Sequence, residues 1–221
     1  MGGPTQPLLE ASLLFTAFYL ASYLSAGSPG QALRLPGFYL AVVTQSLPRS
    51  LLVLYLMARG DGLEAFGIAP PKVRDVPRGL ACGLGAAFVV LVPAFLFSTL
   101  GVENPIFAGA GSGPRASLAL LPLAIVTSLA TGYCEELFFR SYLLRRLGQA
   151  GLSPTWASLA SSLLFGSGHA YQGVVGIVSG SLLGLFFAWR WSESRNIHEI
   201  AVGHGLFDAA VFAILLYARY S

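Results

Sequence analysis

The chain alternates long apolar stretches with short polar breaks, and this pattern predicts its architecture. A helix needs about 20 mostly apolar residues to cross the ~30 Å hydrocarbon layer of a bilayer. Seven stretches approach that length: roughly 8–26, 38–58, 79–100, 117–140, 154–171, 173–191 and 199–218. The fifth and sixth are separated only by Ala170 to Gly173. We therefore expect an all-α, polytopic helical membrane bundle with about seven transmembrane helices, or eight if one is hidden.

Composition agrees with a membrane location. Hydrophobic residues make up 55% of the 221 residues and charged residues only 10%, whereas soluble domains carry about 25% charged residues. The formal charge of +3 does not indicate nucleic-acid binding, because the basic residues are scattered singly between apolar stretches. We expect one integral membrane domain over residues 1–221, multi-pass in the cell membrane and in contact with lipid. The sequence leaves the oligomeric state open.

The basic residues also predict an orientation, because cytoplasmic loops are enriched in Lys and Arg. With the N-terminus inside, eight basic residues fall in inner loops: Arg59, Lys72, Arg74, Arg78, Arg145, Arg146, Arg190 and Arg195. Three fall outside: Arg34, Arg115 and Arg219. The N-terminus lacks the positive region of a cleaved signal peptide, so the first apolar stretch is expected to be a transmembrane helix. Seven crossings would then place the C-terminus outside.

Two glutamates and an arginine interrupt the fourth apolar stretch. An ionised side chain at bilayer depth costs about 2.5–3.5 kcal/mol on insertion scales, so such a cluster must face protein or a water-filled cavity. Glu136 and Arg140 are four residues apart and share one helix face. Glu135 is rotated from Glu136 by about 100°. We expect Glu136 and Arg140 to form a structural pair and Glu135 to point into a cavity.

Two of the three histidines also lie inside predicted spans. His169 stands near the end of the fifth span, and His204 shares a helix face with Asp208 in the seventh. The third, His198, is expected in an interfacial loop. A carboxylate in a low-dielectric pocket can activate a water as a general base. Two imidazoles and a carboxylate could instead bind a catalytic zinc ion. A third alternative is structural, because a lone histidine inside a membrane span is more typically a hydrogen-bonded packing residue.

The polar residues fall into three motifs on successive predicted helices: Glu135-Glu136…Arg140, Phe165…His169 and His204…Asp208. In this order they resemble the CAAX prenyl endopeptidase and bacteriocin-processing family, also called abortive-infection-type intramembrane proteases. The resemblance covers roughly residues 115–215. It implies that Glu135 and His169 activate the attacking water. It also implies that His204 and Asp208 support the oxyanion or a metal.

Asp208 departs from the commoner pattern of that family, which has asparagine at this position. An ionised aspartate only accepts hydrogen bonds and would repel an oxyanion, whereas asparagine could donate. Asp208 therefore favours metal ligation or the orientation of His204. If a metal such as Zn²⁺ is bound, its predicted ligands come from Glu135, His169, His204 and Asp208.

The function expected from these residues is an intramembrane endopeptidase. It would hydrolyse a peptide bond near the membrane, with or without zinc, in a peptide or membrane-protein substrate such as a C-terminal signal. One alternative is a proton-coupled transporter, in which acidic and histidine residues relay protons, although the sequence shows no inverted repeat. Another is a non-catalytic immunity or partner protein of the membrane that retains the protease fold.

Two further patterns concern packing. The second span contains Pro48 and Arg49, which predicts a kink and a structural or snorkelling arginine. The sixth span carries Gly176, Gly180 and Gly184 at four-residue spacing, which favours close approach of another helix.

The depths of the predicted site residues do not coincide on straight helices. With a rise of ~1.5 Å per residue, Glu135 would lie about 15 Å, His204 about 8 Å and His169 about 22 Å from the inner helix ends. We therefore expect tilted helices, a break at Gly166 to Gly168, or shifted helix ends.

Overall fold

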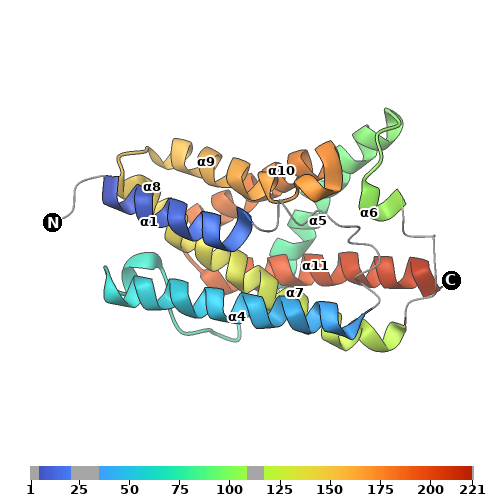
Figure 1. Cartoon of the computed structure of the whole chain (residues 1–221), viewed down its shortest axis with the longest axis horizontal. Helices are drawn as coiled ribbons and strands as arrows, with labels where there is room; N and C mark the ends of the chain where they lie inside the picture. The colour runs from blue at the N-terminus through green and yellow to red at the C-terminus, as the bar shows by residue number, and fades with distance from the viewer. Residues whose placement is uncertain (1–4, 21–34, 109–116, 221) are drawn as a thin grey trace.

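The computed structural model describes residues 5–20, 35–108 and 117–220, and within them the regular secondary structure is helical throughout. The helices run along one elongated bundle (Figure 1). Helix α1 (Thr5–Phe15) begins at the end opposite to the one where α11 (Ile197–Tyr220) ends. The predicted all-α membrane bundle is confirmed.

Five helical segments of the described ranges are long and apolar enough to cross a membrane, judged by length and composition: Pro36–Arg59, Asp75–Thr99, Leu118–Gln149, Ala170–Ser194 and Ile197–Tyr217. They correspond to the predicted second, third, fourth, sixth and seventh spans. The first predicted span is covered in part by α1 and the π-helical segment η1 (Thr16–Leu20). Its remaining residues, 21–26, lie outside the described ranges.

The predicted fifth span, 154–171, is replaced by a shorter helix. Helix α9 (Pro154–Ser167) has 14 residues, which corresponds to about 21 Å and is less than a bilayer crossing requires. The chain then passes through Gly168 and the 3₁₀ turn η5 (Ala170–Gln172) into α10 (Gly173–Ser194). A break at Gly166 to Gly168, one of the three expected alternatives, is present, and it places His169 in the turn between α9 and α10.

The fourth span continues beyond its predicted end at residue 140. The 3₁₀ turn η3 (Leu118–Leu120), α7 (Leu121–Glu136), the π-helical segment η4 (Leu137–Leu143) and α8 (Leu144–Gln149) follow one another without a break. The helix ends where Gly151 adopts a φ of 97° and the amide of Leu152 donates to the carbonyl oxygen of Leu147. Because arginine is compatible with a helix, Arg145 and Arg146 extend it rather than form a loop.

The connection between the second and third spans packs against the bundle. It joins α4 (Pro36–Arg59) to α5 (Asp75–Thr99) through the 3₁₀ turn η2 (Leu63–Phe66). The buried ring of Phe66 stacks on that of Tyr142, with centroids 5.8 Å apart. Asp61 pairs with Arg145 at 2.9 Å. A short helix, α6 (Pro105–Ala108), follows α5.

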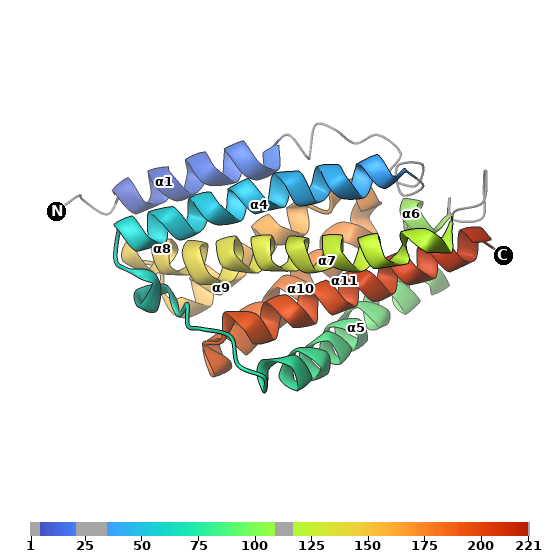
Figure 2. The same ribbon diagram turned by 90° about the horizontal axis from the view of Figure 1, so that it is seen from below.

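Glycines bring the helices around the site into backbone contact. A Cβ atom added at Gly180 would lie 3.1 Å from the Cα atom of Gly166, so α10 packs closely on α9 as the glycine spacing predicted. Helix α11 lies beside α7 and α5 (Figure 2). A Cβ atom at Gly132 of α7 would lie 2.7 Å from the amide nitrogen of Gly205. This contact makes the polar residues of α7 and α11 neighbours.

Candidate active site

Glu136 and Arg140 form a fully buried ion pair, as the sequence predicted. Arg140 Nε lies 3.2 Å from Glu136 Oε2, and both side chains are at most 1% exposed. The guanidinium lies over three aromatic rings, the nearest being Phe165 at 4.5 Å, and donates to the carbonyl oxygen of Gly184 at 3.3 Å. The contact with Glu136 is an ion pair rather than an aligned hydrogen bond. Aromatic rings and one carboxylate therefore stabilise this charge in the bundle.

Glu136 has a second partner that the sequence did not indicate. His204 Nδ1 lies 2.8 Å from Glu136 Oε1, and both residues are buried. Because an ionised carboxylate only accepts hydrogen bonds, Nδ1 carries the proton in this contact. The other ring nitrogen, Nε2, therefore points away from Glu136. Glu136 connects Arg140 to His204 and fixes the orientation of the imidazole.

The free edge of His204 faces two further carboxylates. His204 Nε2 lies 3.7 Å from Glu135 Oε2 and 3.6 Å from Asp208 Oδ2. Both distances exceed those of direct hydrogen bonds, but they suit charge interaction or a bridging water. The predicted sharing of one helix face by His204 and Asp208 is confirmed. The contact with Glu135 brings α7 and α11 together at the site.

His169 is oriented by the end of α9. Its Nδ1 atom lies 3.0 Å from the carbonyl oxygen of Phe165, one turn earlier. A carbonyl only accepts, so Nδ1 carries the proton and Nε2 keeps its lone pair. The ring also contacts the ring of Phe165, with centroids 4.9 Å apart. His169 is therefore held with an unprotonated nitrogen available for a water or substrate.

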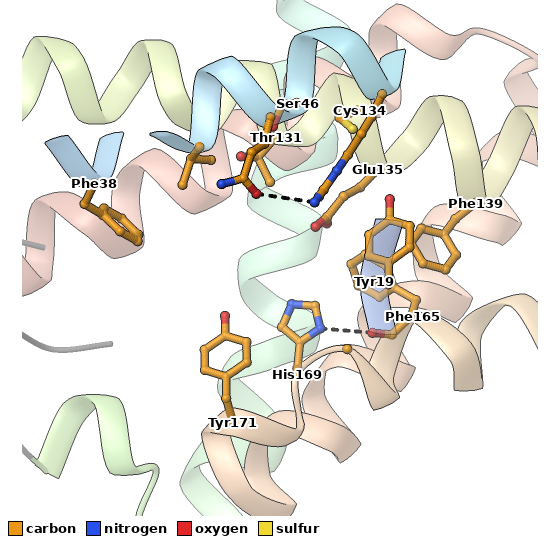
Figure 3. A pocket seen from close by; sticks show the side chains of 14 residues that line it. Tyr19, Phe38, Ser46, Thr131, Cys134, Glu135, Phe139, Phe165, His169 and Tyr171 are labelled. Atoms are coloured by element: carbon orange, nitrogen blue, oxygen red, sulfur yellow. Dashed lines mark hydrogen bonds between the residues drawn. The ribbon is translucent and has the colours of Figure 1, made fainter. Parts of the chain in front are cut away.

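Glu135 and His169 line the same cavity, which has a volume of about 300 Å³ (Figure 3). Tyr19, Cys134 and Tyr171 also contribute to its wall. His204 and Asp208 are not among the lining residues, so they reach the site through Glu135. A larger cavity of about 410 Å³ lies beside α8 and contains none of the motif residues.

The arrangement and order of the three motifs can be compared with known protein families. Residues 117–210 match the Rce1-like family, described as type II CAAX prenyl endopeptidase Rce1-like. The match confirms the resemblance inferred from the motifs and contains every predicted site residue. It supports a CAAX-type protease in a multi-pass membrane protein. No curated protein and no solved structure matches the chain.

The sequence predicted that four of the site residues could bind a metal. Over the described ranges, no group of three or more His, Cys, Asp or Glu residues is arranged to hold a metal ion. The Nδ1 atom of His204 is engaged by Glu136, and that of His169 by a carbonyl oxygen, so a metal could be bound only through the Nε2 atoms of the two rings. Zinc binding by Glu135, His169, His204 and Asp208 stays a prediction.

The structure explains why the depths calculated from straight helices disagreed. Helix α8 extends the fourth span to Gln149, so the helix end used for Glu135 was misplaced. Helix α11 begins at Ile197 rather than at residue 199, and α9 ends at Ser167, so His169 lies in the turn after that helix. The helix ends are therefore staggered. Glu135, His169 and His204 lie at unequal distances from the ends of their helices, but they nevertheless come close together in the bundle.

His198 lies in the first turn of α11 rather than in the predicted loop. Its Nε2 atom lies 2.7 Å from the carbonyl oxygen of Ala69, and its Nδ1 atom lies 3.0 Å from the hydroxyl of Tyr133. Because the carbonyl accepts, Nε2–H donates and Nδ1 accepts from the tyrosine. His198 therefore joins the connection before α5 to α7 and α11, away from Glu135.

Proposed function

We propose that the chain is an intramembrane endopeptidase that hydrolyses a peptide bond with a water activated by Glu135 and His169. One observation carries this proposal: Glu135 and His169, from α7 and from the turn after α9, line the same cavity. The neighbouring Glu136 is held elsewhere by Arg140 and His204. The match to the Rce1-like family supports the same reaction class.

In this mechanism Glu135 takes the proton of the water, and the lone pair on His169 Nε2 orients that water. The water oxygen attacks the scissile carbonyl carbon, and the proton held by Glu135 passes to the leaving amine. No covalent intermediate forms between the peptide and the protein. The buried position of the cavity strengthens these electrostatic interactions, because the surrounding protein screens charge less than water does.

His204 and Asp208 have supporting roles in the proposal. His204 does not line the cavity and acts through Glu135, whose Oε2 atom lies 3.7 Å from His204 Nε2. Glu136 holds the opposite side of the ring. Asp208 lies 3.6 Å from Nε2 and, when ionised, only accepts hydrogen bonds. It therefore acts through His204 and does not stabilise the oxyanion itself.

The proposal is tested by replacing the two residues that share the cavity. Glu135→Gln and His169→Ala should both remain folded in membranes and lose cleavage. Membrane-protein fragments would be compared by mass spectrometry between cells that carry the wild-type protein and cells that carry Glu135→Gln. Glu103→Gln is a matched control, because Glu103 is exposed and does not line the cavity. Undiminished cleavage by purified Glu135→Gln would refute the proposal.

A metal-dependent version makes a separate prediction. Near-stoichiometric zinc in the purified protein, lost in His204→Ala and accompanied by inhibition with chelators, would establish a metallopeptidase. An active preparation without metal would leave the mechanism of Glu135 and His169. A transporter would instead show flux in proteoliposomes without proteolysis. A non-catalytic partner would keep its cellular phenotype in Glu135→Gln.

A further inference from the structure

Arg49 lies near the middle of α4 and lines the cavity that contains Glu135 and His169. Its guanidinium donates to Gln45 Oε1 at 3.3 Å and lies 5.7 Å from the ring centre of Phe18. Over the described ranges, no carboxylate lies within ion-pairing distance of Arg49.

Three other arginines of the helical bundle have carboxylate partners. Arg140 pairs with Glu136, Arg146 with Glu10, and Arg190 with Glu199. A guanidinium at bilayer depth is costly and normally faces a cavity or a partner of opposite charge. Arg49 faces a cavity, and the expected partner is not supplied by the described part of the chain. This combination indicates a place for a bound anion.

A carboxylate is the anion that suits this site. The planar guanidinium donates parallel hydrogen bonds to a carboxylate. Gln45 accepts from Arg49 through Oε1, which leaves its Nε2 donors for a ligand. A carboxylate on the substrate would also be repelled by ionised Glu135 in the same cavity, and Arg49 offsets that repulsion.

We propose that Arg49, together with Gln45, binds a carboxylate of the peptide substrate. This inference rests on the proposed peptidase function and adds a determinant of specificity to the same site. The cavity has a volume of about 300 Å³, which is at the small end of ligand pockets. The carboxylate therefore belongs to a group within a few residues of the scissile bond. It is supplied by the free C-terminus or by an acidic side chain.

Three quenched fluorogenic peptide pools test the assignment with the full-length protein in nanodiscs. The first pool ends in a free carboxylate and contains no acidic residue, the second is its C-terminal amide, and the third is the amide with one glutamate after the scissile position. Wild type should cleave the first or third pool at least tenfold faster, in kcat/KM, than the second. A preference for the first pool identifies the C-terminus as the source, and a preference for the third identifies an acidic side chain.

Arg49→Gln should abolish this preference by lowering kcat/KM for the carboxylate-bearing pool to that of the neutral pool measured with the same variant. Arg49→Lys should retain part of the preference, because lysine keeps the positive charge but lacks the planar guanidinium with its parallel donors. Arg59→Gln is the matched control, since Arg59 lies at the end of α4 and donates to Tyr55 outside the cavity. Equal cleavage of all pools by wild type, or an unchanged preference in Arg49→Gln, would overturn the proposal.

Binding and stability separate this inference from the proposed function. If no pool is cleaved, binding of the labelled acid and amide peptides is measured directly. Tighter binding of the acid that is lost in Arg49→Gln supports the carboxylate site even though the peptidase proposal has failed. Equal binding of the acid and the amide overturns the carboxylate site. Thermal unfolding gives a further readout, because a ligand-binding role predicts that Arg49→Gln is as stable as wild type. A melting temperature clearly below that of Arg59→Gln would instead indicate a structural role.

Discussion

His204 Nδ1 lies 2.8 Å from Glu136 Oε1 in the buried centre of the bundle. The other carboxylate oxygen of Glu136 faces Arg140 at 3.2 Å. One carboxylate therefore balances a permanent charge and orients an imidazole whose opposite edge faces Glu135. Glu136 thus orients the imidazole that lies next to Glu135. Replacement of Glu136 and replacement of Glu135 are therefore expected to have different consequences.

Glu136→Gln should destabilise the fold as well as impair activity. It leaves the buried Arg140 without a counter-charge, and removal of one partner of a buried pair typically costs about 3–5 kcal/mol. The unfolding free energy in mixed micelles measures this effect. The double variant Glu136→Gln/Arg140→Met removes both charges and should regain most of the stability without regaining activity, because His204 still lacks its carboxylate. A stable and active Glu136→Gln would contradict this account.

Helix periodicity predicted much of the site. The spacing of four residues placed Glu136 beside Arg140 and His204 beside Asp208, and the angle between neighbours separated Glu135 from Glu136. These relations depend only on local helix geometry, so the sequence contains them. The short α9 was not predicted, because the expected span covered residues 154–171; a break at Gly166 to Gly168 was only one of three alternatives.

Relations between helices could not be predicted in the same way. The contact between Glu136 and His204 depends on how α7 and α11 are staggered, which Gly132 and Gly205 determine through backbone contact. The π-helical segment η4 begins directly after Glu136, and the pattern of residues does not predict it. Arg49 was interpreted as structural or snorkelling. Its position in the second span indicates its depth in the membrane, but the sequence does not show that a cavity lies beside it.

The close packing of α9 on α10 gives a stability prediction. A Cβ atom at Gly166 would lie 2.6 Å from the amide nitrogen of Ser181 and 2.7 Å from the carbonyl oxygen of Ile177. Both are backbone atoms, so the helices would have to separate. Gly166→Ala should cost about 1–3 kcal/mol of unfolding free energy. Gly148→Ala is the control, because nothing lies within 4 Å of its added Cβ atom, and it should be neutral or stabilising.

The position of His169 gives a prediction about catalysis. A Cβ atom at Gly180 would lie 3.1 Å from His169 Nδ1, whereas one at Gly184 would lie 3.0 Å from the Cα atom of Ser162. The two alanine variants therefore crowd the same helix pair to a similar degree, but only Gly180→Ala pushes on the imidazole. We expect kcat of Gly180→Ala to fall about 10- to 100-fold below that of Gly184→Ala. Equal turnover by the two variants would argue against a catalytic role for the placement of His169.

The ion pair between Asp61 and Arg145 predicts how stability depends on pH. Arg145 Nε donates to Asp61 Oδ2 at 2.9 Å, and this hydrogen bond holds the pKa of Asp61 below its usual value of 3.8. A carboxyl whose pKa is lower in the folded state stabilises the protein above its unfolded pKa, and this contribution disappears as the pH falls through the folded value. Asp61→Asn should therefore lower the melting temperature at pH 7, and the difference from wild type should shrink as the pH falls below about 3.8. Glu64→Gln is the control on the same connection, since Glu64 is exposed, and it should change the melting temperature little at either pH. A deficit in Asp61→Asn that remains equally large in acid would show that the residue acts through packing rather than through its charge.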